Sequence, residues 1–256
     1  MSTIATPSWP DASAPLGAGV EVLQTNPAGI VALAKPAGIL SHPNKAGDEG
    51  LSLLNATYTQ TGECYTWVDR AGGKQRAWLL NRLDSATSGV VLLAIDEGLA
   101  SHIRSLFKTK RIQKYYTALV FGRPIGRREG WRDRIAVQKS GGQIRTAGRG
   151  NIPAEATMQL LKATTTNPPL SLIQLEPKTG RSHQLRVQCA QRHLPIVGDA
   201  TYGDFRLNRA FAKTTGEKRL FLHSARTCFE FEWQGRRHRF NAEAPVPTEF
   251  TAGWTK

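Results

Sequence analysis

The sequence has little cysteine and no long apolar run, and both shortages exclude classes of protein. Its 256 residues include three cysteines, Cys64, Cys189 and Cys228, which are widely spaced and never form a C-x-x-C pair. This pattern argues against a disulfide scaffold or a cysteine zinc site and is typical of a reducing cytosol, so we expect a cytoplasmic protein. No apolar run approaches the ~20 residues of a membrane helix, and the N-terminus lacks the pattern of a secretion signal.

The motifs of metal, nucleotide and serine-nucleophile sites are also missing from the sequence. The six histidines form no H-x-x-x-H pair, and none stands beside a cysteine pair. There is no P-loop, no G-x-G-x-x-G and no G-x-S-x-G. We therefore expect an activity that needs neither a metal nor a cofactor.

Acidic residues are scarce in the segment between Arg104 and Arg149. It contains thirteen Lys or Arg residues and two acids, Glu129 and Asp133, and so holds most of the net charge of +14. A solvated face mixes both signs, so a block of one sign predicts a polyanionic partner. Nucleic acid is the first candidate and an acidic membrane surface the second, although the apolar anchors of a membrane-binding helix are not evident.

Hydrophobic periodicity predicts more strands than helices, which favours an α+β fold with a largely antiparallel sheet. Residues 44–76 read as irregular, with a weak helical patch over 51–58, and residues 122–153 as an exposed basic loop or hairpin. The other predicted elements are strands over 30–34, 77–80, 90–95, 113–122, 157–163 and 170–177, a helix over 97–110 capped by Asp96, a helix within 180–194 capped by Ser182, and a hairpin turning at Gln234–Gly235.

The stretch "NRLDSATSGVVLLA" at 81–94 places Asp84 in a bend rich in small residues, directly before a buried strand. Asp84 is either a turn residue bonded to its own backbone or a group that does chemistry, and the local sequence leaves both open. Arg181 and Arg186 lie at the start of the predicted second helix, an unfavourable place for a cation. They are either ordinary surface residues or bind a carboxylate or phosphate.

The same stretch resembles the H-R-L-D-x-x-T-S-G signature of the RluA-type pseudouridine synthases. Three further stretches agree with that family in the expected order: "VALAKPAGILSHP", "KYYTALVFG" and "PKTGRSHQLRVQCAQRHLPIVGDATYG". "LFLHSARTCFEF" matches a later family strand in part. The resemblance spans about residues 25–245 and implies a pseudouridine synthase fold, with a mostly antiparallel central sheet flanked by helices and loops and an active cleft across the sheet. We expect a loose tail over 1–22 and one catalytic domain over 23–256, without an S4 module.

The resemblance also implies roles for individual residues in turning uridine of RNA into pseudouridine. Asp84 becomes the catalytic carboxylate, acting at C1′, at C6 or as a base at C2′, and Arg181 pairs with it. Tyr116 contacts the uracil, either by stacking or by helping to remove the C5 proton, and Arg82 fills the space left by the extruded base. The remaining predicted contacts to substrate are Asn81, Thr87, Lys35, Lys114, His183 and Arg186, together with the basic-loop residues Arg127, Arg128, Arg132 and Arg134.

One departure keeps a second interpretation open. Asn81 stands where the family has histidine, so a non-catalytic RNA-binding protein on the same scaffold is the alternative to an enzyme. A glycoside hydrolase, a third interpretation, needs two carboxylates about 5–9.5 Å apart, and Asp84 has no acidic neighbour within ten residues. We expect a monomer that acts on ribosomal or transfer RNA.

Overall fold

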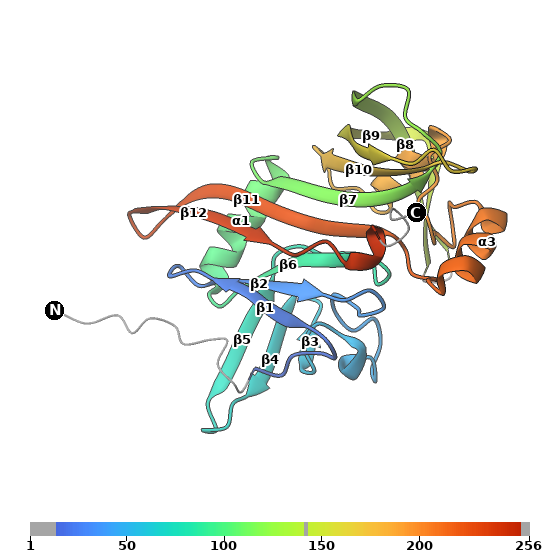
Figure 1. The fold of residues 1–256 in the computed structure, drawn as a ribbon. Coiled ribbons are helices and arrows are strands. Elements are labelled where there is room, and N and C mark those ends of the chain that lie inside the picture. The colour runs from blue at the N-terminus through green and yellow to red at the C-terminus, as the bar shows by residue number, and fades with distance from the viewer. Residues whose placement is uncertain (1–13, 141–142, 252–256) are drawn as a thin grey trace. The chain divides into compact units, whose positions relative to one another are not determined.

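The computed structural model describes residues 14–140 and 143–251 and groups the chain into two compact units. The first unit holds the chain up to Ile112 and returns for Arg226–Ala244. The second unit holds Gln113–Ala225 and the chain from Pro245 onward. Figure 1 shows the course of the chain through both units. Among the described residues, no helix has the length and apolar character needed to cross a membrane.

The first unit is built on six antiparallel strands and one amphipathic helix. Their order in the sheet is β1-β2-β6-β5-β4-β3. The bounds are β1 Glu21–Thr25, β2 Ile30–Lys35, a 3-10 turn η1 Glu49–Leu51, β3 Thr57–Thr59, β4 Cys64–Val68, β5 Lys74–Leu79, β6 Ser88–Ala94 and α1 Glu97–Lys108.

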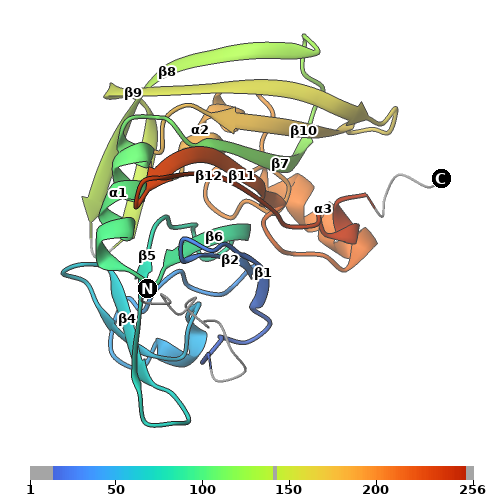
Figure 2. The ribbon, with the colours of Figure 1, turned by 90° about the vertical axis from the view of Figure 1, so that its left-hand side faces the viewer.

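The helix α1 forms where the periodicity predicts it, because Asp96 caps its first turn. The Asp96 carboxylate accepts a hydrogen bond from the backbone N–H of Leu99 at 2.7 Å. The helix packs on β5 and β6, and its side chains Leu99 and Ile103 are fully buried. Figure 2 shows α1 in the ribbon. This packing places the bend between β5 and β6 at the edge of a solid core.

A hairpin completes the first unit. It joins β11 (Leu222–Trp233), whose first residues belong to the second unit, to β12 (Arg236–Glu243). Gln234 and Gly235 both have positive φ, as a two-residue hairpin turn requires, so the predicted turn is confirmed. Phe229, Phe231 and Phe240 pack from this hairpin into the core that contains α1.

The second unit is a four-stranded antiparallel sheet in the order β7-β10-β9-β8, with α2 packed against β8 and β9. The basic segment over 122–153, predicted as a loop or hairpin, is largely a long hairpin. The bounds are β7 Gln113–Phe121, β8 Arg128–Ser140, β9 Gln143–Ala163, β10 Leu170–Pro177, α2 Gln184–Gln191, α3 Phe205–Thr215 and a 3-10 turn η2 Thr248–Phe250. The predicted α+β class with a mostly antiparallel sheet is confirmed.

Several local predictions were wrong. Residues 51–58 form no helix, because Leu53 and Leu54 are buried in the first unit by contacts distant in sequence. Ser182 does not cap α2, since the cap position is His183. The strands β1, β3 and β4 and the helix α3 were not predicted.

The predicted loose tail divides into two parts. Residues 1–13 lie outside the described residues, so that part stays a prediction. Residues 14–22 are ordered, since Leu16 bridges to Leu54, Val20 is buried and β1 begins at Glu21.

Candidate active site

The bend between β5 and β6 carries Asp84 and begins where the ladder between these strands ends. Leu80 makes the last backbone bond, donating to the Leu92 carbonyl at 2.9 Å. The Asn81 side chain then continues the ladder, since its Oδ1 accepts from the Leu92 N–H at 2.8 Å. Asn81 therefore acts on the backbone of β6, which gives the departure from the family histidine a structural role.

Two buried side chains, Ser41 and Lys35, hold the backbone of this bend through hydrogen bonds. The Ser41 hydroxyl donates to the Leu83 carbonyl at 2.9 Å and accepts from the Leu83 N–H at 3.0 Å. The Lys35 ammonium donates to the carbonyls of Ser85, Pro36 and Ile39 at 2.9, 2.9 and 2.6 Å. Because buried polar groups need such partners, these bonds lock the backbone on both sides of Asp84.

Two predicted substrate contacts of the first unit, Lys35 and Thr87, are buried. Lys35 is 1% exposed and ties two loops together, so it supports the bend. Thr87 is also buried, and its N–H closes a turn on the Asp84 carbonyl at 3.0 Å. Both residues shape the bend through its backbone.

Asp84 and Arg82 remain at the surface of the bend. Asp84 is partly exposed, between the backbone positions that Ser41 and Lys35 hold. The Arg82 side chain is 60% exposed and lies 3.6 Å from the Glu63 carboxylate. An ion pair this exposed binds weakly, which leaves the guanidinium able to exchange Glu63 for another anion.

In the second unit, β7 presents Lys114 and Tyr116 on one face. They are two residues apart, and side chains alternate across a strand. The Lys114 side chain reaches the turn before α2. Its ammonium nitrogen lies next to Gly180, 3.6 Å from where a Cβ on that glycine would be. Burial lowers the pKa of Lys114 to about 8.

The Gln184 side chain organises the turn that carries Arg181. Its Oε1 accepts from the Thr179 hydroxyl at 2.7 Å and from the Arg181 N–H at 3.1 Å. Its Nε2 donates to the Glu155 carbonyl on β9 at 3.0 Å. The Arg181 side chain itself is exposed, and its Nε lies 3.4 Å from the Pro153 carbonyl. Gln184 therefore fixes the backbone of the turn and leaves the guanidinium at the surface.

His183 follows in the left-handed conformation, with φ of 53°, which is uncommon for a residue with a side chain. Its Nδ1 lies 2.8 Å from the Tyr202 hydroxyl, and that hydroxyl accepts from the Thr146 N–H at 2.9 Å. The Tyr202 hydroxyl therefore joins the His183 ring to the backbone of β9. His183 is held by β9 and by the loop before α3.

Arg186, predicted to contact RNA, is buried and bound to a carboxylate of the protein. Its guanidinium makes two hydrogen bonds of 2.8 Å to the Asp199 carboxylate, and both residues are buried. Burial alone would raise the pKa of Asp199, but hydrogen bonds and charge from Arg186, with the N–H groups of Tyr202 and Thr201, hold it below its usual value. The pair fastens α2 to the loop before α3.

The predicted basic residues lie on and just before the edge strand of the second unit. Arg128, Arg132 and Arg134 belong to β8, and Arg127 precedes it. All four are exposed. The three on β8 sit on a regular strand instead of an irregular loop, so their spacing is set by the sheet.

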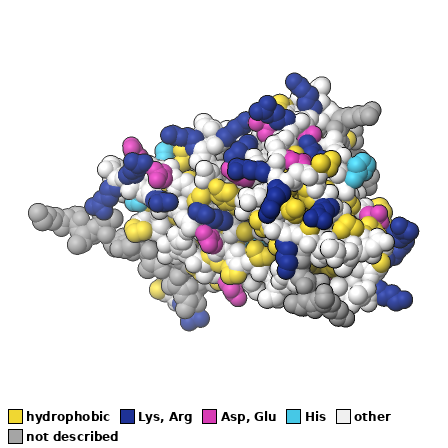
Figure 3. Space-filling model, turned by 45° about the horizontal axis from the view of Figure 1, so that its top comes forward, with side chains coloured by type: hydrophobic (Ala, Val, Ile, Leu, Met, Phe, Trp, Pro, Cys, Tyr) yellow, Lys and Arg dark blue, Asp and Glu magenta, His cyan; other side chains and the backbone are white. Residues whose placement is uncertain are grey.

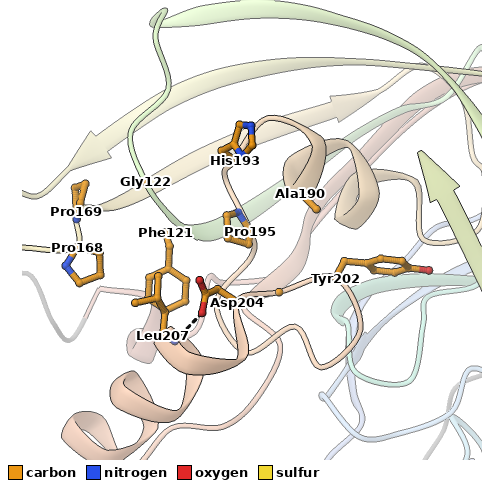
Figure 4. Close-up of a pocket in the computed structure, with 11 residues that line it drawn as sticks. Phe121, Gly122, Pro168, Pro169, Ala190, His193, Pro195, Tyr202, Asp204 and Leu207 are labelled. Carbon is orange, nitrogen blue, oxygen red and sulfur yellow. Dashed lines mark hydrogen bonds between the residues drawn. The ribbon is translucent and has the colours of Figure 1, made fainter. Parts of the chain in front are cut away.

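The second unit also contains a pocket of about 450 Å³, which Figure 4 shows. It lies between the end of β7 and the start of α3, where the Asp204 carboxylate caps the helix through the N–H groups of Arg206 and Leu207. None of its lining residues is a predicted site residue, but Tyr202, which lines it, is hydrogen-bonded to His183. Among residues 14–140 and 143–251, no cluster of three or more His, Cys, Asp or Glu could hold a metal ion.

The structure thus gathers the predicted residues into two groups. Asp84, Arg82 and Asn81 share the bend of the first unit, while Tyr116, Lys114 and Arg181 belong to the second unit. Sequence reasoning missed the two side chains that do most of the holding, Ser41 and Gln184. Both lie inside the matched stretches "GILSHP" and "TGRSHQLR", and a small polar residue next to a site loop was the available signal.

Comparisons with known proteins show which family the chain resembles. Residues 29–191 match a family described as RNA pseudouridylate synthase. The chain is 35% identical over 221 residues to tRNA pseudouridine synthase C of Pasteurella multocida, covering 82% of this chain and 85% of that protein. It is 32% identical over 219 residues to the protein of that name from Salmonella typhi, covering 81% and 78%. The fold is similar to Human RNA Pseudouridylate Synthase Domain Containing 4, with a TM-score of 0.62, 24% identity and 90% of each chain covered.

Proposed function

The chain belongs to the RNA pseudouridylate synthase family, and from this premise we propose that Asp84 is the catalytic carboxylate of an enzyme that acts on transfer RNA. An enzyme of this family isomerises uridine in RNA to pseudouridine. The bond between C1′ and N1 breaks, the base rotates, and C5 bonds to C1′. N1 gains a proton and C5 loses one, so the reaction is balanced without an added reactant.

The rigid bend around Asp84 is the observation that carries this proposal. Ser41 and Lys35 fix the backbone on either side of Asp84, while its carboxylate stays partly exposed. A group held in this way needs little reorganisation as charge develops in the transition state. The carboxylate acts either as a nucleophile on C1′ or C6 or as a base at C2′.

The second unit supplies the other groups that we propose for the reaction. Arg181 pairs with Asp84 and holds the carboxylate in one orientation. Tyr116 contacts the uracil, and Lys114, on the same face of β7, binds a nearby phosphate. The support for these roles is the turn that Gln184 organises, because it presents Arg181 at the surface near Lys114. We propose that His183 lines the same part of the site.

Extrusion of the target base gives Arg82 its proposed role. Taking a base out of its stack costs a few kcal/mol, and a side chain that enters the vacated space recovers part of that cost. Arg82 suits this because it is exposed, carries a planar guanidinium and forms a weak pair with Glu63.

The proposal that the RNA is a tRNA rests on the named relatives. Both the Pasteurella multocida and the Salmonella typhi proteins are tRNA pseudouridine synthases, and the chain aligns with most of each. We also propose that the enzyme works as a monomer in the cytoplasm. Free thiols at Cys64, Cys189 and Cys228 support a reducing compartment.

The test compares two turn aspartates of the first unit, Asp84 and Asp69. Asp69 caps the β4–β5 turn by accepting from the N–H groups of Ala71 and Gly73. Wild type and the variants Asp84→Asn and Asp69→Asn are incubated with tRNA and with ribosomal RNA from a synthase-deficient host, and pseudouridine is measured by mass spectrometry.

We expect wild type and Asp69→Asn to form pseudouridine in the tRNA, and Asp84→Asn to lose at least a thousandfold in rate. If Asp84→Asn stays active, Asp84 is only a turn residue. RNA binding without product in wild type would favour the alternative of a non-catalytic RNA-binding protein. Product in ribosomal RNA alone would overturn the assignment of tRNA.

A further inference from the structure

The outer face of β8 carries three arginines at alternate positions of an edge strand. Within the second unit β8 pairs with β9 alone among the described strands. Arg128, Arg132 and Arg134 lie two or four residues apart and are therefore on one face, where all three are exposed. Gly130 occupies the remaining position of this row and adds no side chain. We call Arg128, Arg132 and Arg134 the β8 arginine row.

Strand alternation places both acids of the basic segment on the opposite face. Glu129 accepts from the Trp131 indole N–H at 3.1 Å and from the Gly126 N–H at 2.8 Å. Asp133 accepts from Gln188 of α2 at 2.6 Å and from Arg192 at 3.0 and 3.2 Å. These carboxylates are already satisfied on the inner side, where Trp131 is buried. Neither acid lies beside the arginines to neutralise them.

The neighbouring strand β9 provides little negative charge to neutralise the row. Glu155 is opposite Arg132 in the register, yet among the described residues no carboxylate lies within 4 Å of any of the three guanidinium groups. Arg134 makes one long contact, 3.4 Å, to the Asn151 carbonyl. Figure 3, which brings the top of Figure 1 forward, shows more Lys and Arg side chains than Asp and Glu side chains. The charge of the row is therefore available to a ligand.

The hairpin of β11 and β12 is also rich in arginine, but its four arginines are interspersed with three glutamates. Arg237 forms an ion pair with Glu230. Arg226 likewise lies 3.4 Å from Glu243. A surface like this mixes both signs and needs no polyanion. The β8 arginine row therefore differs from the hairpin in having cations that form no ion pair with a carboxylate of the described residues, which high net charge alone does not explain.

We propose that the β8 arginine row binds the sugar–phosphate backbone of the RNA substrate. Alternate residues of a strand are about 6.7 Å apart, so Arg132 and Arg134 are one such step apart and Arg128 lies two steps from Arg132. The row therefore presents planar cations along a line that a sugar–phosphate backbone can follow. Contacts of this kind position an RNA without reading its sequence. The inference rests on the proposed function for the identity of the RNA, and adds where the enzyme holds that RNA.

The experiment compares two triple variants with the same loss of charge. Arg128→Gln, Arg132→Gln and Arg134→Gln remove the row, while Arg236→Gln, Arg237→Gln and Arg239→Gln remove three exposed arginines of β12. Each set is placed in the full chain, with and without Asp84→Asn. Binding of a full-length tRNA transcript is measured by fluorescence anisotropy across a salt series, and the variants that keep Asp84 are assayed for pseudouridine.

Removing the row is expected to weaken binding by on the order of tenfold and to lower the slope of log affinity against log salt by about two. The β12 set is expected to change binding less than twofold. KM should rise with the row removed, and kcat should stay within twofold, because the proposed contacts are to the sugar–phosphate backbone and not to the reacting base. Circular dichroism and thermal unfolding check that both sets fold.

Equal binding by wild type and the row variant would overturn the proposal, and so would equal losses in the two sets, which would mean that only net charge matters. A row variant that loses binding to anionic lipid vesicles but not to tRNA would assign the surface to a membrane and overturn it as well. Failure of the proposed function is a separate result, since it appears as no pseudouridine from wild type whatever the binding shows.

Discussion

The bend at Asp84 and the turn at Arg181 are each held by buried side chains that bond to the backbone, but the side chains differ in chemistry. In the bend, cationic and hydroxyl donors from Lys35 and Ser41 take up backbone carbonyls. In the turn, the neutral Gln184 amide accepts from an N–H and a hydroxyl and donates to a carbonyl. In both, a buried side chain fixes the backbone and leaves the proposed functional group at the surface. Supporting and reacting residues are thus separated along each loop.

The largest effect is expected in the bend, from Lys35→Met. The change leaves three carbonyls without the ammonium, and each buried polar group left unpaired costs about 1–3 kcal/mol. Methionine does not carry the desolvation cost of a buried ammonium, and this offsets part of the loss. We therefore expect the free energy of unfolding to fall by about 3 kcal/mol. Urea unfolding measures it, with Lys74→Met, an exposed residue of β5, as the control. A variant as stable as wild type would show that Lys35 does not hold the bend.

A smaller loss is expected in the turn, from Gln184→Leu. Leucine has a similar size but cannot bond the Thr179 hydroxyl, the Arg181 N–H or the Glu155 carbonyl. We expect about 2 kcal/mol of destabilisation and a fall in kcat, because the Arg181 backbone is no longer fixed. Unfolding and pseudouridine formation are measured beside Gln159→Leu, an exposed position on β9. Loss of stability with unchanged kcat would mean that the turn geometry does not matter for the reaction.

The smallest expected effect is a pH dependence of tRNA binding, which we assign to Lys114 of the second unit. Because burial lowers the pKa of Lys114 to about 8, the free protein loses this charge as pH rises through that value. If the ammonium binds a phosphate, the Kd for tRNA rises several-fold between pH 7 and 9. Lys114→Arg keeps the charge and should remove this step, while Lys114→Met should bind weakly at both pH values. A step that persists in Lys114→Arg would assign it to another group.

Local patterns were sufficient for the elements whose signals are strong over a few residues. The helix after Asp96, the apolar strands on either side of the Asp84 bend and the hairpin at Gln234–Gly235 all followed from periodicity, capping and turn chemistry. The strands β3 and β4 were missed because they are short and mix polar with apolar residues, so neighbours distant in sequence decide their conformation.

The sequence by itself determined the family and the residues proposed for chemistry, because both lie in short motifs whose order survives without any knowledge of the fold. Only the tertiary structure decided which cations can meet RNA. Lys35 and Arg186 are basic residues in family motifs, yet their partners Ser85 and Asp199 lie 50 and 13 residues away. The same structure turned Glu129 and Asp133 inward and left the β8 arginines facing solvent. Charge is a property of the residue, but its availability depends on burial and on partners that folding brings together.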